Sequence, residues 1–217
     1  MDGYLTNRWF TGLSQIGPRY FKKKFLLTKI LVFAFLFGGI AFSNESQNEQ
    51  LLFVLPDNWV EIYSDRTENL STSEYAPEGQ TEDNWQEMIS VQILLDTKNR
   101  DPDLMLTKVA SHFKKECRKF SVKPIQLTGI QDIYPSLTMM TYCEQKEGED
   151  FGEIGIVRGI SGKESFYLLQ KLWRTDPFKA DEELPVNLEQ RKFWLGYIAY
   201  LGICNPTLKN CPVNLSP

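Results

Sequence analysis

Residues 154–173 read Ile-Gly-Ile-Val-Arg-Gly-Ile-Ser-Gly-Lys-Glu-Ser-Phe-Tyr-Leu-Leu-Gln-Lys-Leu-Trp. The runs 154–160 and 165–173 are rich in β-branched and aromatic residues, which is typical of strands. Ser161, Gly162 and Lys163 separate them by the length of turn that joins antiparallel neighbours. This stretch therefore predicts a β-hairpin. Gly155 and Gly159 share one face of its first strand, where we expect a helix to cross tightly.

Further strands are predicted on both sides of this hairpin. Five segments have the alternation or the apolar content of strands: 59–63, 71–76, 86–95, 124–127 and 137–145. In the third of these, Ile89, Val91 and Ile93 lie on one face, and Ser90 and Gln92 lie on the other. That pattern predicts a half-buried strand.

Two amphipathic helices are also predicted. The first begins at Asp101-Pro102, because Asp is a favoured N-cap residue and Pro is tolerated at the first helical position. Its apolar stripe consists of Leu106, Val109, Ala110, Phe113 and Cys117. The second begins after Asn187, with Gln190 placed to complete a capping box. Its stripe consists of Phe193, Trp194, Tyr197, Ile198 and Leu201.

A basic cluster follows the first stripe. Lys114, Lys115, Arg118 and Lys119 are expected in the last turns of that helix, where cations complement the helix dipole. The cluster is interpreted as a solvated face, and a patch that binds an acidic partner is the alternative.

The predicted order is three strands, a helix, four strands and a helix. It indicates an α+β fold, with a mostly antiparallel sheet covered by two long helices, in a single domain after an N-terminal signal segment. The chain resembles the PsbP-like family of α/β/α sandwiches, which also begins with a Pro-x-x-Trp turn such as Pro56-Asp57-Asn58-Trp59. The resemblance covers the element order of residues 51–203 and carries over no functional residue. It implies a non-catalytic role, since members of that family are mostly exported or organellar binding and assembly factors.

The N-terminal region has the layout of a secretory signal. An uncharged apolar block at 30–42 follows a basic region with Lys22, Lys23, Lys24 and Lys29, and small residues precede an expected cut after Ser43. As a helix the block would be about 20 Å long, which is short for a bilayer span. We therefore expect a cleaved signal peptide, with an uncleaved anchor as the alternative. Whether residues 1–21 are translated stays open.

The expected organisation follows from this signal. Residues 1–43 are a leader and signal peptide, 44–50 a flexible start, 51–203 the α+β domain, and 204–217 a disulfide loop and C-terminal tail. The first 43 residues hold 6 of the 24 Lys and Arg and 1 of the 28 Asp and Glu, so the remainder has a net charge of −9. Such a chain repels nucleic acid and anionic lipid, so we expect no nucleic-acid partner and membrane contact only through the N-terminal segment.

All four cysteines lie in the exported part. We predict one disulfide between Cys204 and Cys211, because turn-forming residues lie between them, and a second between Cys117 and Cys143. A metal site is the alternative, although the chain has no C-x-x-C motif and only one histidine.

The sequence offers no catalytic set. His112, the sole histidine, is interpreted as a boundary residue of the first helix. A two-carboxylate mechanism needs no histidine, and candidate acids surround the loop before the third strand: Glu74, Glu78, Glu82, Asp83 and Glu87. They are interpreted as surface carboxylates, and no cofactor is expected.

Residues 75–85 are the predicted site of function. This loop is long for a connection between neighbouring strands, and it carries Tyr75, Gln80 and Trp85, a mixture that anchors protein partners. The alternative is that Trp85 folds back to hold the loop on the sheet. We therefore expect a periplasmic or secreted, disulfide-stabilised, non-catalytic binding or assembly component of the cell envelope with a protein partner. The alternatives are a small-molecule or lipid carrier with a pocket between sheet and helices, and a carboxylate-dependent hydrolase.

Overall fold

The computed structural model describes residues 49–127, 134–205 and 211. These residues belong to one compact unit, Ser46–Pro217. The predicted signal segment and residues 44–48 of the predicted flexible start lie outside the described residues. No helix in the described part of the chain is both long and apolar enough to cross a bilayer.

The described chain forms two sheets and two helices. Its elements are β1 (Gln50–Leu52), β2 (Trp59–Arg66), β3 (Leu70–Pro77), β4 (Glu87–Leu94), α1 (Pro102–Glu116), β5 (Cys117–Ile125), β6 (Ser136–Lys146), β7 (Gly152–Ser161), β8 (Phe166–Thr175), α2 (Leu188–Tyr200) and β9 (Gly202–Cys204). The main sheet has the strand order β2-β3-β4-β8-β7-β6-β5, and every neighbouring pair is antiparallel. The predicted α+β fold is confirmed, and the seven strands of the main sheet and the two helices follow the predicted order. The short strands β1 and β9 were not predicted.

The boundary between α1 and β5 differs from the prediction. The helix ends at Glu116, and Arg118 and Lys119 belong to β5 rather than to the last helical turns. The disulfide from Cys117 to Cys143 on β6 explains this difference, because it fixes the chain at the sheet edge at that point. The strand predicted at 124–127 therefore begins earlier.

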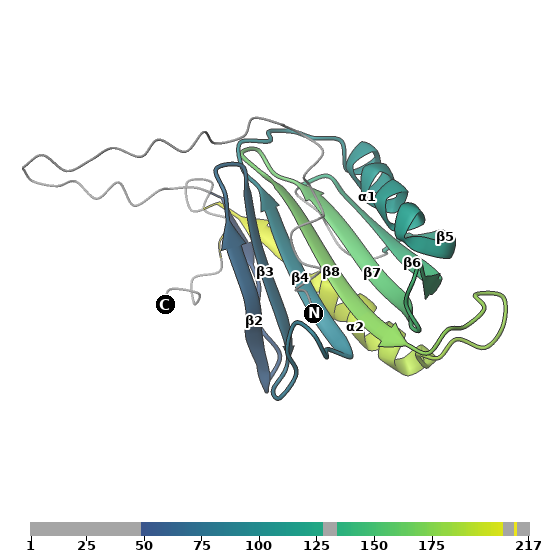
Figure 1. Cartoon of the computed structure of the whole chain (residues 1–217). Coiled ribbons are helices and arrows are strands. Elements are labelled where there is room, and N and C mark those ends of the chain that lie inside the picture. The colour runs from purple at the N-terminus through teal and green to yellow at the C-terminus, as the bar shows by residue number, and fades with distance from the viewer. Residues whose placement is uncertain (1–48, 128–133, 206–210, 212–217) are drawn as a thin grey trace, which may run out of the picture. The chain divides into compact units, whose positions relative to one another are not determined.

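The two helices cover opposite faces of the main sheet (Figure 1). On the face that we call the α1 face, a Cβ added to Gly159 of β7 would come within 3.2 Å of Leu106 of α1. On the other face, which we call the α2 face, Ile156 packs in one cluster with Ile198 of α2. The predicted close approach of a helix is therefore found at Gly159. It is not found at Gly155, where Thr141 and Leu172 of the neighbouring strands fill the space.

Both predicted helix starts are confirmed. Asp101 accepts a hydrogen bond from the Asp103 amide at 3.0 Å, and Asn187 accepts one from the Gln190 amide at 2.9 Å. The predicted stripe of α2 is wrong at one position, because Phe193 is 64 % exposed while Trp194 and Ile198 are buried. Phe193 instead packs its ring edge-on against Trp194 on the outer side of the helix.

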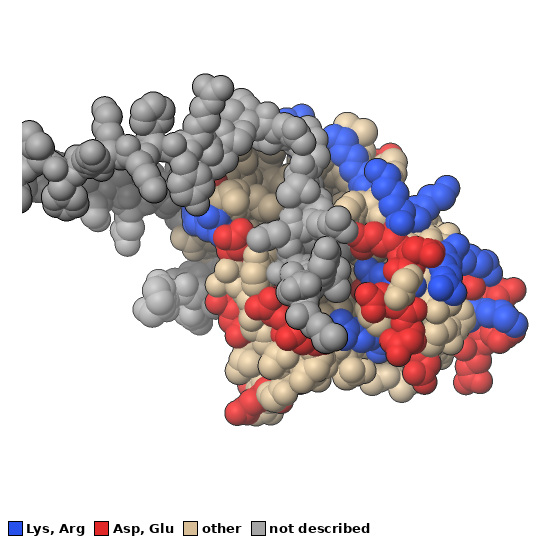
Figure 2. Space-filling model, in the orientation of Figure 1, with Lys and Arg blue, Asp and Glu red and all other residues tan. Residues whose placement is uncertain are grey.

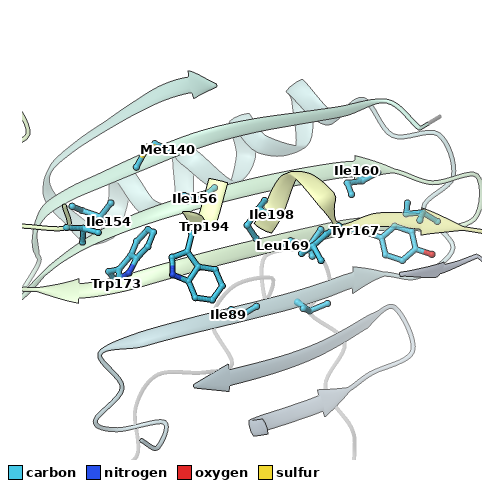
Figure 3. Packing of buried hydrophobic residues seen from close by; sticks show 14 of the residues in the cluster. Ile89, Met140, Ile154, Ile156, Ile160, Tyr167, Leu169, Trp173, Trp194 and Ile198 are labelled. Carbon is cyan, nitrogen blue, oxygen red and sulfur yellow. The ribbon is translucent and has the colours of Figure 1, made fainter. Parts of the chain in front are cut away.

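The main hydrophobic core lies between α2 and the α2 face of the sheet (Figure 3). Trp194 and Ile198 of α2 contact strand residues such as Ile156, Leu169 and Trp173. Arg158 of β7 is buried beside this core and donates hydrogen bonds to the carbonyls of Ile198, Ala199 and Leu201 at 2.7–2.8 Å. It thereby satisfies carbonyls that the C-terminal end of α2 would otherwise leave unpaired.

A second, two-stranded sheet joins the ends of the described domain. Gln50–Leu52 pairs with Gly202–Cys204 in antiparallel register. Glu49 is buried, and its carboxylate accepts hydrogen bonds from the Lys163 and Glu164 amides at 2.7 and 2.9 Å. Of the predicted flexible start, Glu49 is thus bonded to the backbone amides of Lys163 and Glu164, and Gln50 pairs with Cys204 of β9.

Both predicted disulfides are confirmed. Cys117 is bonded to Cys143, and Cys204 is bonded to Cys211. The first bond joins neighbouring strands at the edge of the main sheet, and the second closes a loop directly after β9. Their formation is consistent with an oxidising compartment.

Candidate functional site

The loop between β3 and β4 is held in place by its own polar groups. The Gln80 side-chain oxygen accepts hydrogen bonds from the amides of Gln86 and Glu87 at 2.6 and 3.3 Å. The Asn84 side-chain oxygen accepts one from the Thr81 amide at 2.7 Å. These hydrogen bonds fix the shape of the loop, and the Gln80 side-chain oxygen is used for contacts within the loop.

Trp85 is buried against the sheet. The Arg174 guanidinium of β8 lies 4.4 Å from the centre of the Trp85 ring and 4.4 Å from that of Phe151. Arg174 also donates a hydrogen bond to the Asp83 carbonyl at 3.2 Å. A cation between two aromatic faces is a favourable arrangement. Trp85 thus holds the loop on the sheet, which is the alternative that the sequence left open.

Tyr75 and Trp85 do not come together. Tyr75 of β3 packs against the α2-face core, and its ring centre is 5.3 Å from that of Phe53. Arg174 lies four residues from Gln170 on β8 and therefore shares the opposite, α1 face with it. Because Trp85 stacks on Arg174, Trp85 lies on the α1 face, whereas Tyr75 lies on the α2 face.

A row of polar side chains crosses the α1 face beyond the strands on which α1 packs. Glu74 of β3 lies opposite Ser90 of β4, and Ser90 lies opposite Gln170 of β8. Gln92 lies two residues further along β4 and therefore points to the same face. We call these four residues the acceptor row. In β7 and β6, which α1 contacts, the same row continues with the apolar residues Val157 and Met139.

The acceptor row is buried, and three of its four side chains have an unsatisfied oxygen. Glu74, Ser90, Gln92 and Gln170 are 4 %, 1 %, 2 % and 2 % exposed. The Ser90 hydroxyl and the side-chain carbonyl oxygens of Gln92 and Gln170 have no hydrogen-bond partner within the described ranges. An unsatisfied buried polar group costs about 1–3 kcal/mol, so three of them mark either strain or a place for another molecule.

Glu74 supplies the ionisable group of the row. Burial, with a smaller contribution from the nearby charge of Glu82, raises the pKa of the Glu74 carboxyl to about 7. Glu82 belongs to the loop that Trp85 and Gln80 hold, so the predicted loop and the acceptor row are electrostatically connected. A carboxyl group with a pKa near neutrality is typical of functional sites, because both protonation states are accessible there.

A buried lysine lies on the opposite face. The Lys171 ammonium is fully buried, 2.6 Å from the Glu87 carboxylate, and 4.5–4.8 Å from the ring centres of Trp59, Trp173 and Trp194. Burial lowers the pKa of Lys171 to about 8, although Glu87 opposes this shift. The three tryptophan rings and the Glu87 carboxylate thus all contact the Lys171 ammonium of the protein itself.

A groove lies at the edge of the sheet. It has a volume of about 410 Å³ and is lined by residues from β5, β6 and the segment before α2, including Lys119, Glu144 and Phe178. Lys119 pairs with Glu144 at 2.7 Å, and Glu144 also accepts a hydrogen bond from the Ala180 amide at 2.9 Å. The opposite charges of Lys119 and Glu144 in the groove therefore neutralise each other.

The predicted basic cluster is divided between two elements. Lys114 and Lys115 are exposed on α1, whereas Arg118 and Lys119 lie on β5 and pair with Glu147 and Glu144. Figure 2 shows blue and red side chains interspersed on the side of the molecule where α1 and β5 lie. This mixture is typical of a solvated face.

Among the described residues, no group of three His, Cys, Asp or Glu side chains is arranged to hold a metal ion. His112 is half-buried on α1, and its Nε2 lies 3.2 Å from the Glu116 carboxylate.

Sequence reasoning found Glu74 as a candidate acid but missed the acceptor row. Ser90 and Gln92 were expected on the outer face of a half-buried strand, yet both are buried. Gln170 lies in a strand that looked apolar on both faces. The signal for the row was a polar residue at corresponding positions of three strands, which becomes visible only once β4 and β8 are known to be neighbours.

Comparison of the chain with protein-family models and with curated proteins finds no match.

Proposed function

We propose that the protein is an exported, disulfide-stabilised, non-catalytic binding or assembly component of the cell envelope, and that the acceptor row is its binding face. The single observation that carries this proposal is the set of three buried, unpartnered side-chain oxygens on Ser90, Gln92 and Gln170. Unsatisfied buried polar groups lower stability, and three of them gathered at adjacent positions of β4 and β8 are the feature on which we base the proposed site.

Other features support the same role. The loop beside the row is held by hydrogen bonds of Gln80 and carries Glu82, whose charge raises the pKa of Glu74. The two disulfides are consistent with the oxidising compartment that export implies. Trp85 is proposed as a positioning residue that holds the loop.

The test is recovery of a protein partner from envelope extract at low salt. The bait is the protein purified from cells that express the full chain, as wild type, as Gln170→Leu and as Glu61→Gln. Glu61 is an exposed carboxylate on β2 opposite Tyr75, so it controls for a lost surface polar group outside the row. The proposal predicts one partner that wild type and Glu61→Gln recover and Gln170→Leu does not. Equal recovery by all three, or recovery by none, would contradict it.

Glu74 also supports a second candidate function, the carboxylate-dependent hydrolase. The charge of Glu82 contributes to the raised pKa of Glu74, although burial is the larger cause, and a carboxyl with a pKa of about 7 suits a general acid or base. A screen with chromogenic glycosides and esters tests this function. A hydrolase would lose turnover in Glu74→Gln and keep it in Glu61→Gln, whereas a binding component turns over no substrate.

The carrier alternative has less support. Side chains of Thr141, Leu172, Phe166 and Leu106 fill the spaces beside Gly155 and Gly159, so these glycines open no pocket between sheet and α1. Native mass spectrometry of the purified protein tests the carrier directly, because a carrier retains its ligand.

A further inference from the structure

We infer that the outer side of α2 is a dimer interface, on which a second copy of this chain packs its own α2 in an antiparallel crossing at Gly196. The inference does not depend on the acceptor row, because α2 covers the opposite face of the sheet (Figure 1). It assigns a partner to an apolar surface that the proposed function does not use.

The outer side of α2 is exposed and apolar. Its inner side packs in the main core (Figure 3), whereas Phe193 and Tyr200 are 64 % and 88 % exposed. Phe193, Gly196 and Tyr200 follow one another at spacings of three and four residues, so they form one stripe on the helix. Residues 193–200 include no charged side chain. A helix that is apolar on both sides is ordinarily covered on both, and the described part of the domain covers only one.

Val54 extends this surface. Its side chain is 65 % exposed, and its carbonyl accepts a hydrogen bond from the hydroxyl of Tyr197, which lies one helical turn from Phe193 and from Tyr200. We call Val54, Phe193, Gly196 and Tyr200 the α2 patch. Single exposed apolar residues are common on protein surfaces, but several that gather in one patch mark an interaction surface.

Gly196 has a feature that the described chain does not explain. A Cβ added to it would meet no described atom within 4 Å beyond the adjacent turns of α2, so an alanine would fit there. Glycine in the interior of a helix is less stable than alanine. The missing side chain does let another helix approach closely, because the side chains at the contact set the distance between two packed helices.

The stripe is complementary to a second copy of itself. Phe193 and Tyr200 lie about 4.5 Å and 6 Å from Gly196 along the helix axis, in opposite directions. In an antiparallel pair that crosses at Gly196, the two glycines meet and each Phe193 faces Tyr200 of the other copy. The same two residues thus form both halves of a two-fold symmetric interface, and aromatic pairs of this kind are favourable.

The charges of α2 favour the antiparallel arrangement. Glu189 and Lys192 lie on the N-terminal half of the helix and pair with each other at 3.1 Å. A parallel pair would place each of them beside its own counterpart. The antiparallel pair separates the two Glu189 carboxylates by about 21 Å along the axis, which is more than a Debye length at physiological salt. It also brings Lys192 towards Tyr200 of the other copy, where a cation and a ring attract.

The area of the patch indicates a weak dimer. A fully buried aromatic side chain buries about 150–250 Å², so at the observed exposures the four rings would bury about 600 Å². A standard interface buries about 1,200–2,000 Å², and Val54 and the helix backbone supply part of the difference. We therefore expect a dissociation constant of about 1–100 μM. Both the whole chain and the part after residue 43 are negatively charged, so added salt should strengthen the dimer by screening repulsion.

Sedimentation velocity tests the dimer, with protein purified from cells that express the full chain and concentrations up to about 1 mM. Phe193→Ser and Tyr200→Ser each remove one ring from the patch. Leu104→Ser is the control, because Leu104 is an exposed apolar residue on α1. The inference predicts that wild type and Leu104→Ser dimerise equally and that each patch variant dimerises at least tenfold more weakly.

Gly196→Leu tests the close approach. Leucine is a good helix former and the structure has room for it, so the variant should unfold at the same temperature as wild type or higher. It should nevertheless dimerise at least tenfold more weakly, because its side chain separates the two helices. A merely structural role of Gly196 would not separate these two measurements.

Photo-crosslinking tests the arrangement. A benzophenone amino acid replaces Phe193, and equal amounts of ¹⁵N-labelled and unlabelled protein are mixed before irradiation. Mass spectrometry of the digested dimer should find the label attached to the peptide that contains Tyr200, with one copy of each isotope in the product.

Several results would overturn the inference. These are a wild type that is monomeric at about 1 mM, equal weakening by Leu104→Ser and the patch variants, a Gly196→Leu dimer as tight as wild type, or a crosslink to any peptide other than that of Tyr200. Binding of monomeric wild type, but not of Phe193→Ser, to phosphatidylcholine vesicles would assign the α2 patch to a lipid surface and would equally overturn it.

Discussion

Ser90 of β4 lies directly opposite Gln170 of β8, and neither side-chain oxygen has a hydrogen-bond partner among the described residues although both residues are at least 98 % buried. Such a pair lowers stability, because each group loses its hydration without gaining a protein partner. The loss of stability can be measured by replacing either residue with an apolar one.

Removing these polar groups should stabilise the protein. We expect Ser90→Ala to raise the free energy of unfolding by about 1 kcal/mol and Gln170→Leu by about 1–2 kcal/mol, as measured by urea denaturation. The control is Ser73→Ala on β3, since Ser73 lies on the α2 face and is half-buried. A loss of stability in both row variants would show that an additional partner satisfies these oxygens inside the folded chain.

Glu74 should make stability depend on pH. Its pKa is raised from 4.5 to about 7, so the folded state binds more protons than the unfolded state between these values. Stability is therefore fully present below about pH 4.5 and is lost as the pH rises through 7. We expect Glu74→Gln to match wild type at pH 4 and to exceed it at pH 8 by up to about 3 kcal/mol in denaturant unfolding. Glu61→Gln should show no such difference, and a pH-independent effect of Glu74→Gln would contradict the assignment.

Lys171 should act in the opposite pH range. Its pKa is lowered from 10.5 to about 8, so the unfolded state binds more protons between these values and stability rises with pH across them. Lys171→Met removes the buried charge and should be more stable than wild type at pH 7, by up to about 3 kcal/mol, with the difference shrinking towards pH 10. Chemical denaturation at several pH values measures this. A large loss of stability in Lys171→Met at pH 7 would show that the interactions with Glu87 and the three tryptophans outweigh the cost of burial.

The two disulfides should contribute different amounts to the free energy of unfolding. They join residues 26 and 7 positions apart, and the chain-entropy model assigns about 3.5 kcal/mol to Cys117–Cys143 and about 2.4 kcal/mol to Cys204–Cys211. Replacing both cysteines of each pair with Ala and comparing the unfolding midpoints tests this order. Thiol titration of the unfolded protein, isolated without reductant, should find no free sulfhydryl. Four free thiols would remove the argument for an oxidising compartment.

The fold could largely be predicted from local patterns, and the site could not. Asp101, Asn187 and the glycine-containing turns act within a few residues, so they indicate where helices and hairpins begin. The end of α1 was misplaced because Cys117 is fixed by a bond to Cys143, a contact distant in sequence. The acceptor row likewise depends on the pairing of β4 with β8 across a crossover that includes α1. No local pattern reports which strands become neighbours.

Trp85 illustrates the same limit at one residue. Its place beside Pro77, Gly79 and acidic residues predicts an exposed loop aromatic as readily as a buried one. Trp85 is buried because Arg174, which lies 89 positions later in the chain, stacks on its ring. A partner-binding role for Tyr75, Gln80 or Trp85 stays a prediction, and the structure assigns Gln80 and Trp85 contacts within the domain.

Site-specific photo-crosslinking in living cells tests the central claim most directly. A benzophenone amino acid would replace Thr72, which lies opposite Gln92 on the α1 face, and in a separate strain it would replace Glu61. The account predicts a single crosslinked protein from position 72 that disappears when Gln170→Leu is added, and no such product from position 61. Crosslinks of equal yield from both positions, or a product at position 72 that survives Gln170→Leu, would contradict the assignment of the acceptor row as the binding face.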